Sequence, residues 1–228
     1  MRLISWNVNR RTSVLAEQAH ALAGREPDVV ALQEVTARSR DLWKAAFTTI
    51  GLAHMIWSWP PRPRRTVVMI AAREPLAPAD SLAVPWPETT LAARVAGVTV
   101  HTAHVPNAAN GWVKPDTLAA LRAGLATGSG PRVLCGDLNT PRREHPDGTV
   151  ISFARDTRER LRPERGERWD RAELGVVPGL RDLGFADAFA ADRQRTWVFS
   201  HGGGWRLDHV FLSAELEPVA ATYHHGWR

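Results

Sequence analysis

The sequence predicts an α/β protein in which two mixed β-sheets pack face to face and helices cover the outside. Short β-branched and apolar runs alternate with segments of helical spacing, as in α/β units. A hairpin-like pair of runs in mid-chain and a strand-rich C-terminal part argue against a purely parallel sheet. Two mixed sheets with outer helices satisfy both signals. No linker is visible, so residues 1–228 are expected to form a single domain.

The elements follow in order from local signals. Helices are expected over 13–23, where Ser13 is the N-cap and Gly24 the stop, and over 41–50 and 117–125. Residues 141–183, rich in Arg, should form loops and helix, and the stretch 141–171 is expected to be an excursion near the functional site. Strands are expected over 2–8, 28–35, 53–59, 66–72, 91–96, 98–104, 131–136, 196–199, 205–212 and 217–223.

Composition bounds the class of protein. No apolar run approaches the roughly 18 residues of a membrane span, and the N-terminus lacks the apolar region of a signal peptide. A cytoplasmic, monomeric protein without a membrane span is therefore expected. The single cysteine, Cys135, excludes an internal disulfide and should pack in the core.

The charge balance allows two interpretations. The formal net charge of +5 favours a polyanionic partner such as nucleic acid, yet an arginine-rich and alanine-rich composition alone would also produce it. The segment WSWPPRPRR, residues 57–65, also allows two interpretations. It could stack bases and hold phosphates, or it could be a hairpin loop stiffened by proline.

Polar residues end or follow the apolar runs of five expected strands. They are Asn7, Glu34, His104, Asn107, Asp137, Asn139, Asp208 and His209. Each residue alone could be turn chemistry, but five strands ending this way is improbable for turns alone. In extended chain, Asp137 and Asn139 would project to the same side. They either cap a turn or share a reaction centre.

The residue types point to one kind of chemistry. Glu, Asp, Asn and His without a cysteine cluster favour a hard cation such as Mg²⁺, Mn²⁺ or Ca²⁺ over zinc. Amides and imidazoles can donate hydrogen bonds to phosphate oxygens, and an Asp beside an Asn can take a proton from an attacking water. The set matches metal-assisted hydrolysis of a phosphoester.

The ordered motifs SWNVN, QEV, HVPN, GDLN, DAF and WRLDHVF extend from Asn7 to His209. Together they resemble the endonuclease/exonuclease/phosphatase superfamily, which includes AP endonucleases, deoxyribonuclease-I-like nucleases, sphingomyelinases and inositol phosphatases. The resemblance implies a four-layer α/β sandwich and a Mg²⁺- or Mn²⁺-dependent phosphodiester hydrolase, first of all a nuclease acting on DNA. The alternatives are a phosphatase or phosphodiesterase for a small, inositol or lipid phosphoester, and a non-catalytic nucleic-acid-binding protein.

The resemblance also implies roles for the residues that match its motifs. Glu34 corresponds to the principal metal ligand, Asn7 to an amide near metal and phosphate, and Asp208 to a second acid near the metal. Asp137 corresponds to the residue that activates the nucleophilic water. Asn139 is implied to help position that water and the phosphate.

Further roles follow from the same motifs, with two departures. His209 is implied to contact the scissile phosphate, Asp187 to hydrogen-bond that histidine, and Asn107 to contact phosphate. Asn9 stands where AP endonucleases often have an acid, which puts a second metal ion in doubt. His104 stands where they have Tyr, and it could be a general acid, a phosphate ligand or a structural residue.

Overall fold

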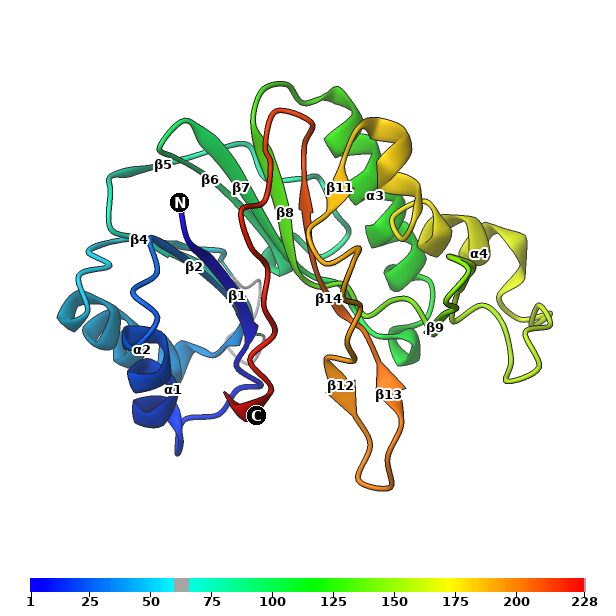
Figure 1. Ribbon diagram of the computed structural model, residues 1–228, viewed down its shortest axis with the longest axis horizontal. Helices are drawn as coiled ribbons and strands as arrows, with labels where there is room; N and C mark the ends of the chain where they lie inside the picture. Colours follow the sequence, from blue (N-terminus) through cyan, green and yellow to red (C-terminus); the bar gives the residue numbers. More distant parts are fainter. Residues whose placement is uncertain (60–65, 228) are drawn as a thin grey trace.

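The computed structural model describes residues 1–59 and 66–227, which form two larger β-sheets packed face to face with helices outside (Figure 1). The predicted fold class is confirmed. The N-terminal sheet has the strand order β1 (Leu3–Asn7), β2 (Val29–Val35), β4 (Val67–Ala72) and β3 (His54–Trp57). The C-terminal sheet has the order β11 (Ala186–Asp187), β14 (Asp208–Leu212), β8 (Arg132–Asp137), β7 (Val98–His104), β6 (Thr90–Val95) and β5 (Leu76–Pro78).

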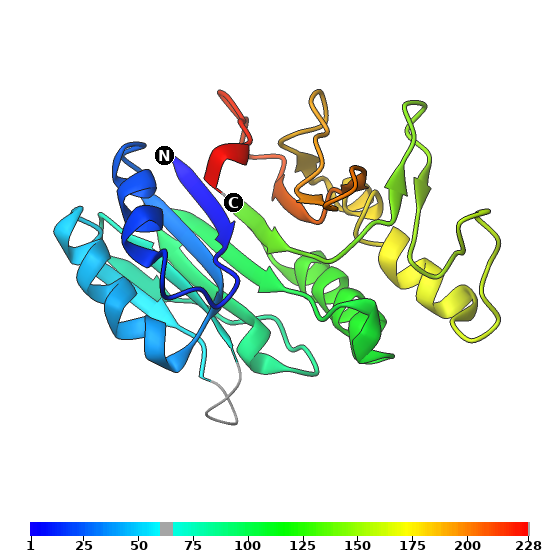
Figure 2. The same cartoon turned by 90° about the horizontal axis from the view of Figure 1, so that it is seen from below.

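The helices form the two outer layers (Figure 2). Helices α1 (Leu15–Ala23) and α2 (Ala37–Thr49) cover the N-terminal sheet, whereas α3 (Val113–Thr127) covers the C-terminal sheet and α4 (Gly166–Leu174) packs beside α3. The shorter elements are the 3₁₀ turns Pro87–Thr89, Ala108–Asn110, Gly179–Leu183 and His225–Trp227, and the ribbons β9 (Arg143–Glu144) with β10 (Val150–Ile151) and β12 (Trp197–Val198) with β13 (Gly204–Trp205).

Three apolar cores separate the four layers. Trp43 and Phe47 of α2 fill the core between the first helices and the N-terminal sheet. Cys135 and Ile70 lie in the core between the two sheets, and Leu121 belongs to the core under α3. Successive side chains of a strand point to opposite faces, so β8 supplies two cores at once, with Leu134 under α3 and Cys135 between the sheets.

The strand pairing brings the polar strand ends to one place. β1 with β2 and β7 with β8 are parallel, and the other pairs are antiparallel. In the C-terminal sheet, Asp137 at the end of β8 lies between His104 of β7 and Asp208 of β14 in the register. Three of the expected site residues are therefore neighbours within one sheet.

A β-bulge in β2 places the corresponding residues of the N-terminal sheet. The register of β2 with β4 shifts between Leu32 and Val35, and Glu34 in the bulge has a φ of 58°. A bulge re-aims a side chain by breaking the strict alternation of the strand. The preceding Gln33 is fully buried, and its Nε2 donates a hydrogen bond to Thr102 Oγ1 of the other sheet at 3.0 Å. The bulge residue Glu34 is thus anchored next to an inter-sheet contact.

Helix starts differ from the sequence expectations. Ser13 does not cap α1, whose N-cap is Val14 without a side-chain hydrogen bond. α2 begins at Ala37, before the expected residue 41, because Thr36 and Ser39 form a capping box. The hairpin turn is confirmed, since Ala96 and Gly97 both have positive φ between β6 and β7.

The expected strand over 217–223 is wrong. These residues form no strand and are mostly exposed, and Pro218 has no N–H to give to a neighbouring strand. Residues 60–65 of the WSWPPRPRR segment lie outside the described residues. In the part of the chain that is described, no helix has the length and apolar composition to cross a membrane.

The close approach of β7 to β8 depends on a glycine. Gly136 has a φ of 136°, and a Cβ atom there would lie 2.0 Å from the carbonyl oxygen of Ala103. We predict that Gly136→Ala lowers the free energy of unfolding by at least about 3 kcal/mol, from backbone strain and overpacking together. Gly97 has a φ of 78° with no atom within 4 Å of such a Cβ, so Gly97→Ala should cost only about 1 kcal/mol. Urea unfolding measures both variants, and equal losses would contradict this reading.

Candidate active site

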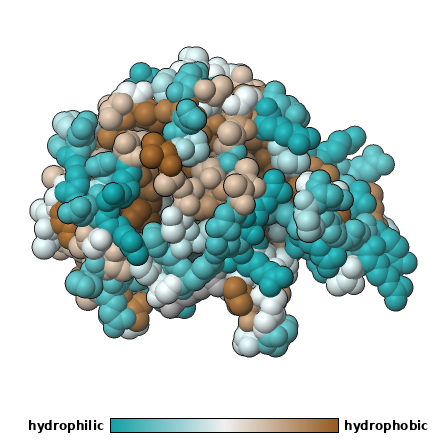
Figure 3. Space-filling view, viewed as in Figure 1, coloured by the Kyte–Doolittle hydropathy of each residue, from teal (hydrophilic) through white to brown (hydrophobic). Residues whose placement is uncertain are grey.

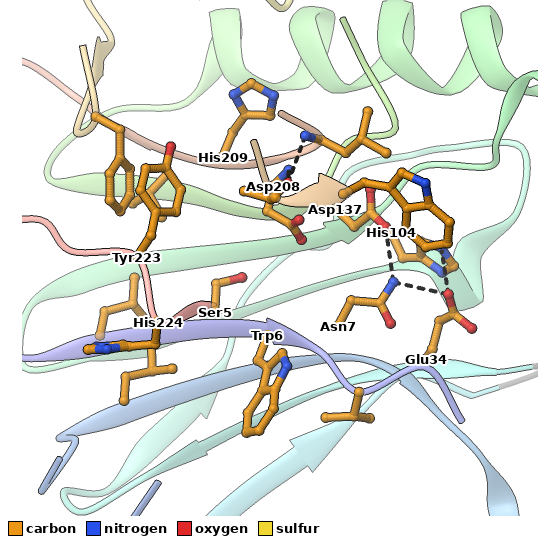
Figure 4. A pocket seen from close by; sticks show the side chains of 18 of the residues that line it. Ser5, Trp6, Asn7, Glu34, His104, Asp137, Asp208, His209, Tyr223 and His224 are labelled. Atoms are coloured by element: carbon orange, nitrogen blue, oxygen red, sulfur yellow. Dashed lines mark hydrogen bonds and ion pairs between the residues drawn. The ribbon is translucent and has the colours of Figure 1, made fainter. Parts of the chain in front are cut away.

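One amide joins the two sheets at the end of the inter-sheet space (Figure 4). Asn7 Nδ2 donates hydrogen bonds to Glu34 Oε1 and to Asp137 Oδ2, each at 3.0 Å. Asn7 Oδ1 accepts from the backbone N–H of Asn9 at 2.9 Å, which fixes the orientation of the amide. Asn7 and Glu34 belong to the N-terminal sheet and Asp137 to the C-terminal sheet. The structure therefore brings these three predicted residues together.

His104 and Asp208 complete the cluster. His104 Nε2 lies 3.6 Å from Glu34 Oε1, and the side chain of Glu34 is 14% exposed. Burial lowers the pKa of His104, and the charges of Glu34 and Asp208 oppose that shift. Both carboxylates therefore favour the charged form of the imidazole.

Asp137 has the environment of a proton acceptor. Burial raises the pKa of Asp137 to about 6, although the hydrogen bonds from Asn7 and from the Asn139 backbone oppose the shift. A carboxylate with a pKa in that range can take a proton from water near neutral pH.

The conformation of the turn after β8 shows which of the two expected roles Asp137 and Asn139 have, the capping of a turn or a shared reaction centre. Asn139 is not extended, because its φ is 51°, and its backbone N–H donates to Asp137 Oδ1 at 2.9 Å. Its side-chain Nδ2 donates to the carbonyl oxygen of Val105 at 2.8 Å. Asp137 therefore caps this turn and also belongs to the cluster, with one oxygen engaged in each.

A cavity of about 1900 Å³ opens at the cluster and runs along β1 and β14. Asn107 and Asn139 line it together with the cluster residues, as does the aromatic pair Trp197 and Trp205 of the β12–β13 ribbon. Asn107 Oδ1 accepts a hydrogen bond from the backbone N–H of Ala109, so the asparagine also caps the short turn after β7. In the view of Figure 3, apolar surface gathers on the side of the N-terminal strand, while the surface around α4 is almost entirely hydrophilic.

The structure does not bring His209 to this cluster. Along β14, Val210 packs in the inter-sheet core with its neighbours, whereas Phe211 packs in the core under α3. His209 shares the side of Phe211, on which it stacks at 5.6 Å between ring centroids, and it is only 1% exposed. Its Nε2 donates to the carbonyl oxygen of Thr140 at 2.7 Å. His209 nevertheless lines the cavity, on the opposite face of β14 from Asp208, so its expected contact with a substrate phosphate stays a prediction.

Asp187 likewise differs from expectation. Its Oδ2 accepts a hydrogen bond from Arg206 Nη2 at 2.7 Å instead of bonding His209, and Arg206 also forms two hydrogen bonds with Glu144 at 2.6 and 2.8 Å. Burial raises the pKa of Asp187, and the hydrogen bond and charge of Arg206 outweigh burial, so the net shift is downward. Asp187 belongs to a buried ion-pair network at the edge of the C-terminal sheet.

Arg10, which was not among the predicted site residues, also contacts the cluster. Its Nε lies 2.9 Å from Glu34 Oε2, and its backbone N–H donates to the Glu34 carbonyl oxygen at 3.2 Å. Asn9 and Arg10 have φ values of 50° and 56°, which turn the chain back toward Glu34. No motif or periodicity signalled this contact, because it depends on the backbone of the turn after β1.

The cluster offers oxygen donors rather than a preformed metal cage. Among the described residues, no three His, Cys, Asp or Glu side chains are placed to hold a metal ion. Mg²⁺ needs fewer protein ligands, because it keeps several waters and takes one or two carboxylates. Glu34 and Asp208 with the amide of Asn7 fit that donor chemistry. The guanidinium of Arg10 already places positive charge at Glu34, where a metal cation would compete with it.

The fold and site define a class of α/β sandwich proteins with carboxylates and amides gathered at one end of the paired sheets. A model of the endonuclease/exonuclease/phosphatase family matches residues 4–226. The chain belongs to this family, whose members are phosphodiester hydrolases.

Individual relatives agree with that assignment. DNA repair nuclease APEX1 of Danio rerio is 27% identical over 241 residues, which cover 96% of this chain and 74% of that protein. The 3′-5′ exonuclease NExo of Neisseria meningitidis is 25% identical with a TM-score of 0.67, over 94% of this chain and 88% of that one. An AP endonuclease of Archaeoglobus fulgidus, 22% identical with a TM-score of 0.65 over 95% and 88% of the two chains, shares the fold.

The burial of His209 should be measurable as a pH dependence of stability. Burial, followed by the charge of Arg206, lowers the pKa of His209 from 6.5 to about 4. The unfolded chain therefore binds a proton as the pH falls below about 6.5 while the folded chain does not, so stability is lost between pH 6.5 and 4. We predict that the free-energy difference between the wild type and His209→Gln shrinks by roughly 2 kcal/mol from pH 7 to pH 5. Urea unfolding at the two pH values checks this, and a pH-independent difference would contradict it.

Proposed function

We propose that this chain is a Mg²⁺- or Mn²⁺-dependent phosphodiester hydrolase that acts on DNA. The observation that carries the proposal is the amide of Asn7, which holds Glu34 and Asp137 of different sheets together at the mouth of a large cavity. Membership of a family of phosphodiester hydrolases supports the reaction type. The names of the APEX1 and NExo relatives, a DNA repair nuclease and an exonuclease, and the net charge of +5 support a nucleic-acid substrate.

Asp137 is the proton acceptor in this proposal. The backbone N–H of Asn139 holds its Oδ1 and the amide of Asn7 holds its Oδ2, so the plane of the carboxylate is fixed. A fixed carboxylate with a raised pKa can orient a water and accept its proton during attack on phosphorus.

The remaining residues handle charge on the phosphate. Glu34, with Asp208 and Asn7, would hold the cation, which when bound stabilises negative charge on the phosphate. His104 and Asn107 line the cavity beside them and can hydrogen-bond phosphate oxygens. Arg10 would leave Glu34 for the phosphate in this proposal, since its side chain is 65% exposed. The scheme does not depend on His209 or Asp187, and a contact of His209 with the phosphate stays a prediction.

The test is hydrolysis of abasic-site duplex DNA, plain duplex, RNA and a small phosphodiester in parallel, with Mg²⁺ or with EDTA. We expect cleavage of DNA only with the cation, and a loss of at least about 100-fold in kcat for Asp137→Asn and Glu34→Gln. Glu159→Gln is the matched control, because Glu159 pairs with Arg143 outside the cluster. Its activity should equal that of the wild type.

Other results of this experiment would indicate a different mechanism or function. Full activity in EDTA, or in Asp137→Asn, would refute the mechanism. Cleavage of the small phosphodiester that DNA does not inhibit would assign the chain a small-molecule, inositol or lipid phosphoester instead. No hydrolysis of any substrate, with retained binding of DNA, would identify a non-catalytic nucleic-acid-binding protein.

A further inference from the structure

A buried carboxylate bonds the residue that follows the turn of Asp137 and Asn139. Glu173 of α4 is fully buried, and each of its oxygens has two partners. Oε1 accepts from Trp169 Nε1 at 2.6 Å and pairs with Lys114 Nζ at 2.8 Å. Oε2 accepts from Thr140 Oγ1 at 2.6 Å and from the backbone N–H of Phe153 at 2.8 Å. One side chain therefore ties α3, α4 and the segment after β10 to Thr140.

Thr140 connects this carboxylate to the site. It directly follows Asn139, and it is fully buried. Its hydroxyl bonds Glu173, and its carbonyl oxygen accepts from His209 Nε2 at 2.7 Å. Both the hydroxyl and the carbonyl group of Thr140 are thus held, immediately after the turn in which Asn139 bonds Asp137.

Stability alone does not require an ion pair at this place. Lys114 and Glu173 both have fully buried side chains, and Lys114 Nζ lies 4.3 Å from the centroid of the Phe153 ring. Replacing a buried ion pair by apolar residues of similar volume is often neutral or stabilising. A charged acceptor, by contrast, forms stronger and more directional hydrogen bonds than a neutral one, which suits a position that must be held accurately.

We propose that Glu173 is a positioning residue, which fixes the turn bearing Asp137 and Asn139 through the hydroxyl of Thr140. His209 supports the same turn through the Thr140 carbonyl. The expected effect on kcat rests on the proposed function. The expected effect on the structure of the turn does not. Residues 141–174, which include α4, are by this account part of the apparatus that orients the proton acceptor.

The test compares two buried hydroxyls that each donate to a carboxylate of α4. Thr140→Val removes the bond to Glu173 and keeps the shape of the side chain, whereas Thr140→Ser keeps the hydroxyl. Ser152→Ala is the matched control, because Ser152 is fully buried and donates to Asp170 Oδ1 at 2.5 Å without reaching the turn. The readouts are kcat, KM, Tm and the hydrogen-exchange rate of the Asn139 backbone amide.

We expect Thr140→Val to lower kcat by roughly 10- to 100-fold with KM within about twofold, because small misplacements of a catalytic group have effects of that size. The Asn139 amide should exchange at least about 10-fold faster, since the turn opens locally. Thr140→Ser should keep kcat and the exchange rate of the Asn139 amide at their wild-type values. Ser152→Ala should lower Tm and leave kcat and that exchange rate unchanged.

Two results would overturn the proposal. One is unchanged exchange at Asn139 in Thr140→Val, and the other is an equal change in Ser152→Ala. If the wild type hydrolyses no phosphodiester, the proposed function fails, and the exchange rate of the Asn139 amide then decides the positioning role alone.

Discussion

Two carboxylates on different sheets, Glu34 and Asp137, share the two N–H groups of one amide, that of Asn7. Carboxylates in a partly buried place are costly unless donors or cations compensate them. The mutual repulsion shows in the pKa of Asp137, which burial raises first and the charge of Glu34 raises further. Asn7, the backbone N–H of Asn139 and the guanidinium of Arg10 supply the compensation. The site thus keeps a concentration of negative charge at the junction of the sheets, where a hard cation and a phosphate can meet.

The geometry of that junction follows from strand periodicity and one bulge. His104, Asp137 and Asp208 are neighbours in the register of three adjacent strands, so a single sheet fixes their spacing. On the other sheet, β1 places Asn7, and the bulge of β2 turns Glu34 toward it. Substrate-binding groups carried by strands and their immediate turns are held more rigidly than groups on long loops.

The sequence was sufficient for the fold class and for most of the cluster. Apolar runs and turn signals predict the strands well, and the polar residues at their ends met as expected at Asn7, Glu34, His104, Asp137 and Asp208. The motif did not reveal that His209 lies on the side of Phe211, on the opposite face of β14 from Asp208. Both residues line the cavity, so the contact of His209 with a substrate phosphate stays a prediction.

Other features could not be read from local patterns. The contact of Arg10 with Glu34 depends on two consecutive left-handed residues, and only Asn9 is of a type that favours this conformation. The bonds of Glu173 join segments far apart in the chain, and the Arg206 network replaces the partner expected for Asp187. Residues 217–223 have strand-like composition, but strand formation also requires a partner strand to bond. That the 228 residues form a single domain stays a prediction.

The claim at the centre of this account is that the cluster holds a divalent cation through Glu34. Titration of Mn²⁺ into the wild type and Glu34→Gln at pH 7.5, followed by electron paramagnetic resonance of the free ion, tests it without any substrate. We expect the wild type to bind Mn²⁺ and Glu34→Gln to bind it at least about 10-fold more weakly. Equal affinity of the two proteins, or no binding by the wild type, would contradict the account.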